Sequence, residues 1–517
     1  MSKYELMMKS LLTLLIFLMT TERVLIYAQN DNATNQKKLI INTREDSFKH
    51  LGIKSLMPSS EKGHHFVVYG DSCSGAKTTG AGHEENFASI NGVLARLDPM
   101  PQFICFLGDN IAGGTSDYDN LRQQWHYWIN KEMAWLNKSV PVYNVTSNHN
   151  TYDVSSERVF REIFADIPSN GPPDQKGLAY FIRRDDLLLV FTNTFFSGAG
   201  GGPHVEHDWL DRVLTQNQDA RLKIVLGHHP ILPVNGYGQY WTVPHEEGEL
   251  FWNVLARHGV CAYLCSHIIA FDVRVQQGVL QILTGGAGTN FGPGGFMPGQ
   301  TEYLHFVQMV LDLNGLRYQV VDKSGNIRET LCWPLSIPPI EGWMELSQST
   351  VNDLVLLRNC QTKSGSSSEE LIILWQFSGQ YPPSVFGQEQ TFICGWDMME
   401  GPQTLWIGLD CLSRLTVHLI PVPGGGIQIW QGPYLPPKND FDVQIAIHTG
   451  MGPGGIMWRA GDTGKWSSLV SSSSRGAERT AWPTQWMLKQ TSIQGEKKFL
   501  GKTLKTSFKV VKKQKAG

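Results

Sequence analysis

The chain has 517 residues, which is more than one hydrophobic core usually holds, so two or more domains are expected. Its hydrophobic content of 41% and charged content of 18% are typical of globular protein and argue against a disordered chain. The formal net charge of -3 argues against a nucleic-acid coat or a bulk membrane-surface protein, and we find no nucleic-acid-binding signature.

The first residues predict a targeting segment. Lys3 and Lys9 precede an apolar stretch from Leu11 to Met19, about half of the roughly 20 residues that a membrane-spanning helix needs. Ala28 then offers a small residue at a cleavage point. We therefore expect a secretory signal peptide over residues 1–28, followed by an N-terminal extension over residues 29–62. The protein is expected to be exported, to a periplasm, the outside of the cell or the cell surface. The alternative is an uncleaved N-terminal anchor, and no other membrane span is expected.

Short apolar runs alternate with amphipathic stretches between about residues 64 and 269. The runs are rich in Val, Ile and aromatic residues and are bounded by Gly, Asn or Asp, which is typical of buried strands. This alternation predicts an α/β domain, which we place at residues 63–332. The expected strands are His65–Tyr69, Phe103–Leu107, Val140–Val145, Leu187–Phe191, Leu222–Leu226 and Cys261–Cys265. The expected helices are Glu84–Leu97, Tyr118–Leu136, His207–Leu214 and Glu247–His258, with only strands and turns after Gly278.

The proline-rich segment Trp333–Pro339 marks a boundary, and we expect a linker over residues 333–342. Beyond it, apolar runs are separated by Gly/Pro turns and show little helical periodicity. This pattern predicts an all-β sandwich over residues 343–517, ending in a lysine-rich tail that we interpret as solvated. The expected strands include Leu371–Phe377, Thr404–Leu409, Leu415–Ile420 and Val443–Ile447.

The predicted sandwich weakly resembles laminin-G or concanavalin-like domains. Such domains bind carbohydrate or protein surfaces, so a glycan or a protein is an alternative ligand for this region. Ten of the 16 tryptophans lie from Trp333 onward, and we interpret them as core residues rather than sugar platforms.

Eight cysteines are present, and in an oxidising compartment some of them can pair. Cys394 and Cys411 flank a predicted hairpin and are the best candidate pair, although connectivity cannot be deduced from sequence. Cys105 and Cys261 lie inside apolar runs and are expected to be core residues.

Polar clusters directly follow five of the predicted strands. Because the carboxyl ends of strands line the functional crevice of an open α/β sheet, side chains from all five clusters are expected to converge. Two carboxylates, an amide oxygen and two imidazoles suit Mn, Fe or Zn better than Ca or Mg, so a bound ion of Mn, Fe or Zn is expected, and the resemblance described next implies one or two such divalent or trivalent ions. The converging residues are Asp71, Asp109, Asn148, His228 and His267, whereas His229 is interpreted as structural.

The order of the clusters resembles the calcineurin-like metallophosphoesterases, whose motifs read Asp-x-His, Gly-Asp-x-x-Asp, Gly-Asn-His-Asp/Glu, Gly-His and Gly-His-x-His. The segments Leu107–Asn110, Leu188–Asn193 and Val225–Pro230 look especially like the purple acid phosphatase branch. The resemblance covers about residues 64–322. It implies a four-layer α/β sandwich with a two-metal site that hydrolyses phosphoesters.

The resemblance implies an asymmetric metal site. The ligand set of one metal is complete and consists of Asp109, Asn148, His228 and His267. The other set keeps Asp71 and Asp109 but is otherwise damaged. Cys73 stands where many members have His, Ala112 where the purple branch has a metal-binding Tyr, and Ile269 where the final His belongs. Cys73 can be interpreted either as a replacement thiolate ligand or as a packed thiol.

Two further substitutions concern the turns. The glycines of the third and fifth motifs are Ser147 and Ser266, which predicts reshaped turns because serine tolerates the left-handed region poorly. The Gly-rich stretch Gly285–Gly299 is interpreted either as a surface loop or as a lid over the site.

The resemblance implies metal-assisted hydrolysis of a phosphoester substrate, with His149 protonating the leaving oxygen. The expected function is that of an exported phosphatase or phosphodiesterase with an incomplete two-metal site. One alternative is a weakly active or inactive scaffold that keeps the fold. Another is a carbohydrate- or protein-binding protein that acts through its C-terminal β domain.

Overall fold

The computed structural model describes residues 53–75, 83–199, 201–234, 237, 241–290, 302–337, 343–346, 371–380, 389–396, 403–419, 427–435, 440–448, 455–471, 487–489 and 502–512. The expected signal peptide, Cys360, the second part of the Gly-rich stretch and the end of the linker lie outside these residues. Within the described ranges, no helix has both the length and the apolar character needed to cross a membrane. Residues 53–54 and 96–100 belong to a separate small unit, in which β1 (Ile53–Lys54) pairs in parallel with β3 (Leu97–Asp98).

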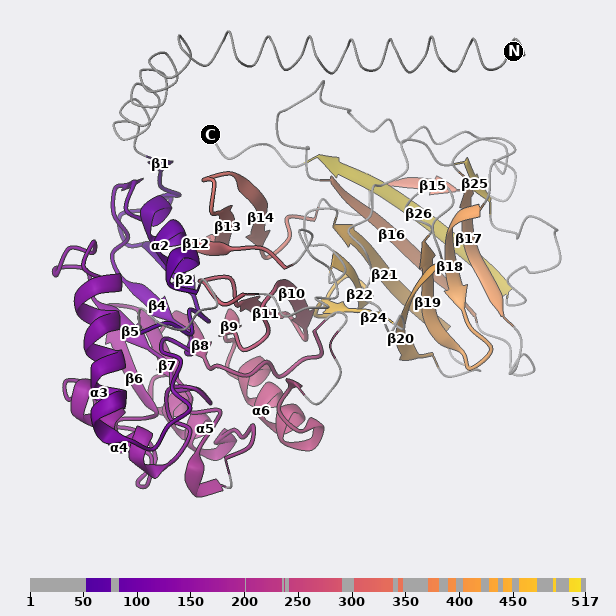
Figure 1. Ribbon diagram of the computed structural model, residues 1–517. Coiled ribbons are helices and arrows are strands. Elements are labelled where there is room, and N and C mark those ends of the chain that lie inside the picture. The colour runs from indigo at the N-terminus through magenta and orange to yellow at the C-terminus, as the bar shows by residue number, and fades with distance from the viewer. Residues whose placement is uncertain are drawn as a thin grey trace, which may run out of the picture. The chain divides into compact units, whose positions relative to one another are not determined.

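Two six-stranded sheets form the centre of the α/β region (Figure 1). The first has the order β14-β13-β12-β2-β4-β5, and the second has the order β10-β11-β9-β8-β7-β6. The strands of the first are β2 (His64–Tyr69), β4 (Ile104–Phe106), β5 (Val142–Asn144), β12 (His305–Asp312), β13 (Gly315–Asp322) and β14 (Ile327–Trp333). Those of the second are β6 (Tyr180–Arg184), β7 (Leu187–Phe191), β8 (Leu222–Leu226), β9 (Ala262–Cys265), β10 (Phe271–Gln276) and β11 (Val279–Thr284).

Strands β2, β7 and β11 are buried on both faces, which explains their nearly continuous apolar sequences. One face of each sheet contributes to a shared core, in which Phe66 and Leu107 of one sheet region join Phe191 and Ile224 of the other. β2, β4 and β5 run parallel, and so do β7, β8 and β9. The expected α/β organisation is therefore confirmed.

Helices cover the outer faces of the two sheets. The second sheet packs against α5 (His207–Gln216) and α6 (His245–Arg257), whose Trp209 and Phe251 belong to one core with Val190 and Tyr263. The first sheet faces α2 (His83–Leu94), α3 (Tyr118–Tyr127) and a π-helical turn (Trp128–Glu132), largely through aromatic contacts. The order helix, sheet, sheet, helix is the expected four-layer sandwich.

Three elements differ from the sequence predictions. The helix expected to reach Leu136 leaves the α conformation after Tyr127 and continues as the π-helical turn, which hydrophobic periodicity does not reveal. α4 (Val154–Ile163) was not predicted, although Asp153 and Ser156 form a capping box at its start. The first sheet also contains β14 as its edge strand, a strand that the sequence analysis did not place individually.

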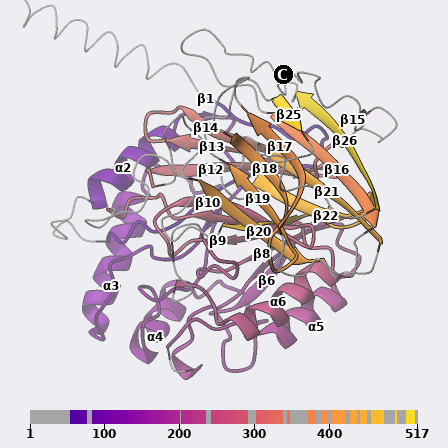
Figure 2. The same cartoon turned by 90° about the vertical axis from the view of Figure 1, so that its right-hand side faces the viewer.

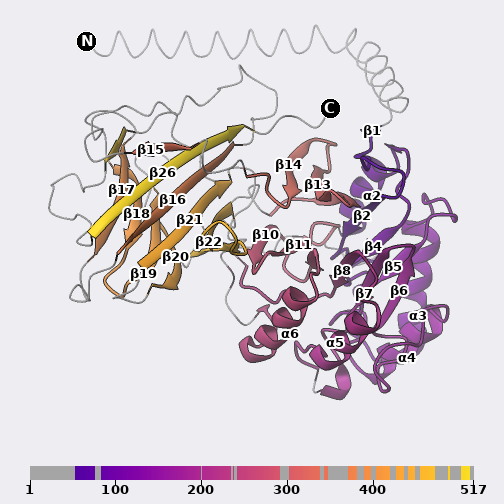
Figure 3. The same ribbon diagram turned by 180° about the vertical axis from the view of Figure 1, so that it is seen from behind.

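The C-terminal strands form two six-stranded antiparallel sheets, with orders β15-β26-β16-β21-β22-β23 and β24-β20-β19-β18-β17-β25 (Figures 2 and 3). Their facing side chains, among them Phe377, Ile407 and Val417, form a separate core. The expected β-sandwich is thus confirmed. The strands of the first sheet are β15 (Met344–Leu346), β16 (Leu371–Gln380), β21 (Asp440–His448), β22 (Ile456–Ala460), β23 (Ser467–Ser468) and β26 (Lys502–Lys512). Those of the second are β17 (Gln390–Trp396), β18 (Gln403–Leu409), β19 (Arg414–Leu419), β20 (Gln428–Tyr434), β24 (Val470–Ser471) and β25 (Met487–Lys489).

Two features of the sandwich bear on the sequence predictions. Trp375, Trp406 and Trp430 are buried, as expected of core residues. The proposed pairing of Cys394 with Cys411 is wrong, because both thiols are free. Cys394 lies opposite Trp406 in the β17–β18 hairpin, whereas Cys411 follows the far end of β18, beyond the pair Gln390–Leu409. The two cysteines flank the hairpin in sequence but lie at different positions along its paired strands.

Candidate metal centre

The five polar clusters lie at the carboxyl ends of five parallel strands. Asp71, Asp109 and Asn148 follow β2, β4 and β5 in the first sheet, while His228 and His267 follow β8 and β9 in the second. Donor atoms of Asp71, Asp109 and His228 lie within 4.8 Å of one another. The structure therefore brings the side chains selected from the sequence to one place.

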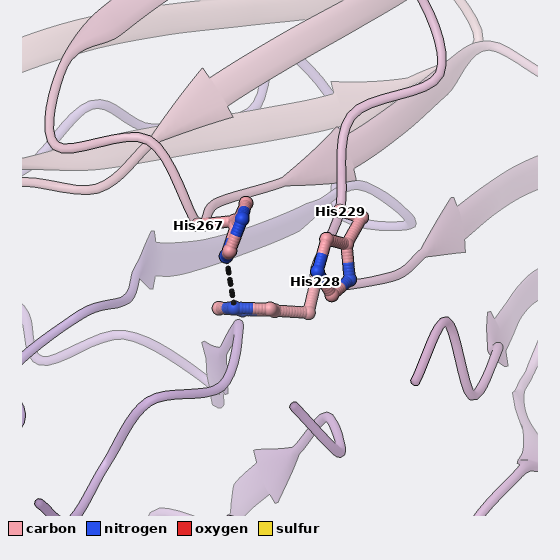
Figure 4. A group of neighbouring side chains, drawn as sticks. All are labelled: His228, His229 and His267. Carbon is pink, nitrogen blue, oxygen red and sulfur yellow. Dashed lines mark hydrogen bonds between the residues drawn. The ribbon is translucent and has the colours of Figure 1, made fainter. Parts of the chain in front are cut away.

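Four of these residues surround a single point, which we call the histidine position: Asp109, Asn148, His228 and His267. His228 Nε2 lies 2.9 Å from Asn148 Oδ1, 3.1 Å from His267 Nδ1 and 3.4 Å from Asp109 Oδ1. Figure 4 shows the close approach of His228 and His267, with His229 beside them. The carboxyl ends of β4, β5, β8 and β9 thus each place one possible metal-ligand side chain at this point.

The hydrogen bonds around His228 fix where its proton lies. Nδ1 is 2.8 Å from the carbonyl oxygen of Leu107, and because a carbonyl only accepts, Nδ1 must donate. Nε2 of the neutral ring then carries a lone pair, and it faces two further acceptors, Asn148 Oδ1 and Asp109 Oδ1. Nitrogen and oxygen atoms with lone pairs, gathered around one point in this way, are the donors that a transition-metal ion takes. The donor set therefore fits a metal ion.

The ionisation states also suit a metal. Burial lowers the pKa of His228, and burial together with His228 lowers the pKa of His267 to about 3, which favours the neutral form of each ring. Burial alone would raise the pKa of Asp109, but any positive charge on the rings of His228, His149 and His267, together with the hydrogen bond with Ser147, lowers it to about 2. The site thus offers one carboxylate and two imidazoles.

Comparison with known proteins bears on this site. Residues 64–271 match the model of the calcineurin-like phosphoesterase family. The chain contains a calcineurin-like phosphoesterase domain. No curated protein matches the sequence.

Among solved structures, the chain is similar to a purple acid phosphatase from yellow lupin (Lupinus luteus) seeds, with 14% identity and a TM-score of 0.38, over 53% of this chain and 54% of that one. It is also similar to GAP50, "the anchor in the inner membrane complex of Plasmodium", with 15% identity and a TM-score of 0.37, over 54% and 90% of the two chains. A third similar structure is PhoD, with 11% identity and a TM-score of 0.36, over 55% and 74%. The chain thus spans about half the length of the lupin phosphatase that it matches.

Asp71 is held firmly within the phosphoesterase domain. Its Oδ2 accepts hydrogen bonds from the Ser266 hydroxyl and from the backbone N–H of His267, the latter at 3.1 Å. Its Oδ1 is buried and has no hydrogen-bond partner among the residues that the structure describes. Burial and the neighbouring charge of Asp109 raise the pKa of Asp71 well above its usual range. Asp71 can therefore offer only Oδ1 to a cation.

The two serines at the motif glycine positions do not adopt the left-handed conformation. Positive φ angles occur instead at Asp71 (64°), Asp109 (50°) and His267 (71°), where the backbone is strained for residues with a Cβ. Ser147 Oγ accepts the backbone N–H of Asp109 at 2.8 Å. Both serines thus support the carboxylates, which sequence reasoning missed because it considered only their backbone preferences.

His149 lies beside the histidine position, with a side chain that is 40% exposed. Its Nδ1 is 2.6 Å from the carbonyl oxygen of Ala112 and therefore donates to it, while Nε2 lies 3.9 Å from Asp109 Oδ2. The charge of Asp109 raises the pKa of His149, although burial opposes this. The backbone oxygen of Ala112 thus accepts a hydrogen bond from His149, while the side chains of Ala112 and Ile269 have no atom that can bind a metal.

His229 is the residue that sequence reasoning placed outside the site. Its ring centroid lies 4.1 Å from that of His267, and its Nδ1 lies 3.1 Å from Thr194 Oγ1. Ligand atoms of His228, His229 and His267 fall within 4.8 Å of one another. The only sequence signal was the adjacent pair of histidines in Gly227-His228-His229.

Proposed function

We propose that this protein is an exported, metal-dependent phosphoester hydrolase, either a phosphatase or a phosphodiesterase. The observation that carries the proposal is the convergence of lone pairs from His228, Asn148 and Asp109 inside a calcineurin-like phosphoesterase domain. Imidazole, amide and carboxylate donors in one cluster suit Mn, Fe or Zn, of which one or two ions would bind.

Asp109, Asn148, His228 and His267 would hold the ion. When bound, it would supply Lewis-acid polarisation of the phosphoryl group and a lower pKa for a water molecule, toward about 7. The protein's part is to fix the ligands. Leu107 orients His228, and the two serines hold Asp109 and Asp71 through hydrogen bonds. Such supporting contacts set the orientation and basicity of metal ligands.

His149 is the proposed proton donor. The hydrogen bond from Nδ1 to the Ala112 carbonyl oxygen fixes the orientation of the His149 ring. Nε2 is then the ring nitrogen that gains or loses a proton. The ring is partly exposed, so a substrate can reach it, and Asp109 favours its protonated form. His149 would pass the Nε2 proton to the leaving oxygen as the phosphorus–oxygen bond breaks.

A scaffold that keeps the fold without catalysis is the second candidate. Ile269 and Ala112 favour it, because neither side chain can coordinate a metal where the family has a ligand. The histidine position favours hydrolysis instead, because it gathers imidazole, amide and carboxylate groups that can each act as a metal ligand.

An assay of the full chain on phosphomonoesters and phosphodiesters tests the proposal. We expect hydrolysis that a chelator abolishes and that added Mn, Fe or Zn restores, and an Asn148→Ala variant that hydrolyses none of the substrates. Hydrolysis at an equal rate by Asn148→Ala would assign the activity to another site or to a contaminant. No hydrolysis by a metal-loaded parent protein would favour the scaffold.

A further inference from the structure

The edge strand β10 meets a short segment of the sandwich. β10 stands at the end of the second sheet, with β11 as its neighbouring strand, so the N–H groups on its other side need partners from elsewhere. The N–H of Val275 donates to Ser468 Oγ and that of Gln277 donates to Ser467 Oγ, each at 2.9 Å. Two serine hydroxyls of β23 thus take the place of a neighbouring strand. We call residues 465–468, which contain β23, the cover segment.

The cover segment also holds the turn between β10 and β11. Gln277 and Gly278 have φ angles of 50° and 80°, the left-handed values that a tight two-residue hairpin turn requires. The N–H of Gly278 donates to the carbonyl oxygen of Trp466 at 2.8 Å. The carbonyl oxygen of Gly278 accepts the indole N–H of Trp333 at 3.2 Å. Both backbone groups of Gly278 are therefore bonded, one to the cover segment and one to the last residue of β14.

Lys465 extends the contact to a helix. Its Nζ lies 3.1 Å from the carbonyl oxygen of Ala256, in the last turn of α6. The last four carbonyl groups of an α-helix have no partner within the helix and carry partial negative charge, so a lysine ammonium is favourable there. The cover segment thus binds the second sheet and one of the helices that pack on it.

Apolar side chains reinforce these hydrogen bonds. Trp466 is 6% exposed and belongs to one core with Val273 and Val275 of β10. Leu374 and Met457 of the sandwich are fully buried and belong to the same core. The contact between the cover segment and β10 is therefore part of a larger apolar core.

The middle of the first sandwich sheet is buried on both faces. Leu374 and Met457 alternate along their strands with Ile373 and Ile456, which face the core between the two sandwich sheets. The antiparallel sheets of a domain that stands alone commonly leave one face to solvent. The second face of this sheet instead belongs to the core that contains β10, which is the arrangement of two domains that share structure.

We propose that the sandwich is a permanent cover for β10, and that the phosphoesterase domain and the sandwich fold and unfold as one cooperative unit. β23 is itself the last strand of its sheet, so two sheet edges cover each other. An uncovered edge strand offers its backbone groups to a second chain and promotes aggregation, and the cover segment removes this hazard. None of these residues belongs to the histidine position, so the inference stands or falls separately from the proposed function.

Hydrogen-exchange mass spectrometry of the full chain across a urea series tests the cooperative unit. Peptides from β8 of the phosphoesterase domain and from β19 of the sandwich should lose protection at the same urea concentration. Distinct midpoints for the two peptides would overturn the proposal, because each domain would then unfold by itself.

A double variant, Ser467→Ala with Ser468→Ala, tests the cover segment without urea. The amides of Val275 and Gln277 should exchange about 2- to 10-fold faster than in the parent, the scale of one lost hydrogen bond each. Ser378→Ala is the matched control, because Ser378 lies in β16, three strands from β23 in the sheet order, and it should leave β10 unchanged. Equal exchange of β10 in the parent and the double variant, or an equal rise in Ser378→Ala, would overturn the cover.

Discussion

The hydroxyl of Ser266 donates a hydrogen bond to Oδ2 of Asp71, although 195 positions separate the two residues in the sequence. Asp71 follows β2 of the first sheet and Ser266 follows β9 of the second, so this bond joins the two sheets at the candidate metal centre. Both side chains are fully buried. A serine at a glycine position of the family's motif thus has a structural role in this chain.

Ser266→Ala should lower the free energy of unfolding by about 1–3 kcal/mol, because it leaves a buried carboxylate oxygen with one donor fewer. Denaturant unfolding of the parent and the variant measures the difference. Ser89→Ala is the control: it removes an exposed hydroxyl that bonds only to the backbone of Asn86, so its effect should stay within about 0.5 kcal/mol. Equal effects of the two substitutions would show that the bond to Asp71 contributes nothing.

Asn148→Ala and His149→Ala should separate metal binding from proton transfer. Asn148 Oδ1 lies at the histidine position, so its loss should remove metal and rate together. His149→Ala should keep the ion at the histidine position but lose about 10²–10⁴-fold in rate on a substrate with a poor leaving group. Metal content and rate must be measured on the same samples. A parent-like rate in His149→Ala on such a substrate would remove His149 from the mechanism.

Gly108→Ala should disturb the histidine position. Gly108 has a φ of 94°, and an added Cβ would lie 2.7 Å from His228 Nδ1 and 2.6 Å from Ser147 Cβ. His228 would then lose its bond to Leu107, and metal affinity should fall. Gly259→Ala is the matched control, because Gly259 has a φ of 64° with nothing within 4 Å of the added atom. The Gly259→Ala substitution should lower the free energy of unfolding by roughly 1–2 kcal/mol and leave metal binding unchanged. Unchanged metal binding in Gly108→Ala would contradict the placement of His228.

Glu132 should make stability depend on pH. Burial raises the pKa of Glu132 to about 7, although its Oε2 accepts bonds from Ser74 and Gly75. The folded state holds the Glu132 proton more tightly than the unfolded state does, so protonated Glu132 contributes to the free energy of unfolding. This contribution is fully present below the pKa of Glu132 in the unfolded chain and is lost as pH rises through about 7.

Glu132→Gln, which cannot ionise, should therefore gain thermal stability relative to the parent between about pH 5 and pH 8. The comparison of melting temperatures at the two pH values isolates Glu132, since all other groups are shared. A constant difference between parent and variant would show that Glu132 has no perturbed pKa.

The sequence was sufficient to predict which side chains lie together, because strand ends in parallel sheets are spatially predictable. Asp109, Asn148 and His228 each follow an apolar run that is a strand in the structure. Nothing local to Ser266 or Cys73 indicates their partners, which come from elements distant in the chain. The π-helical turn was also missed, because hydrophobic periodicity does not distinguish a short π-helical turn from a continuing α-helix.

Several expectations stay predictions. The signal peptide and export concern residues outside the described ranges, and the boundary at residues 333–342 and the likeness of the sandwich to laminin-G domains are also open to experiment. The assignment of individual ligands is likewise a prediction, and its physical support is the donor geometry around His228.

Elemental analysis of the purified full chain, made on the same samples as a phosphoester hydrolysis assay, tests the central claim most directly. The account predicts at least one Mn, Fe or Zn ion per chain that survives dialysis, with hydrolysis that disappears when a chelator removes the ion and returns when the ion is restored. A chain that binds none of these metals when they are supplied, or hydrolysis that continues after complete metal removal, would contradict it.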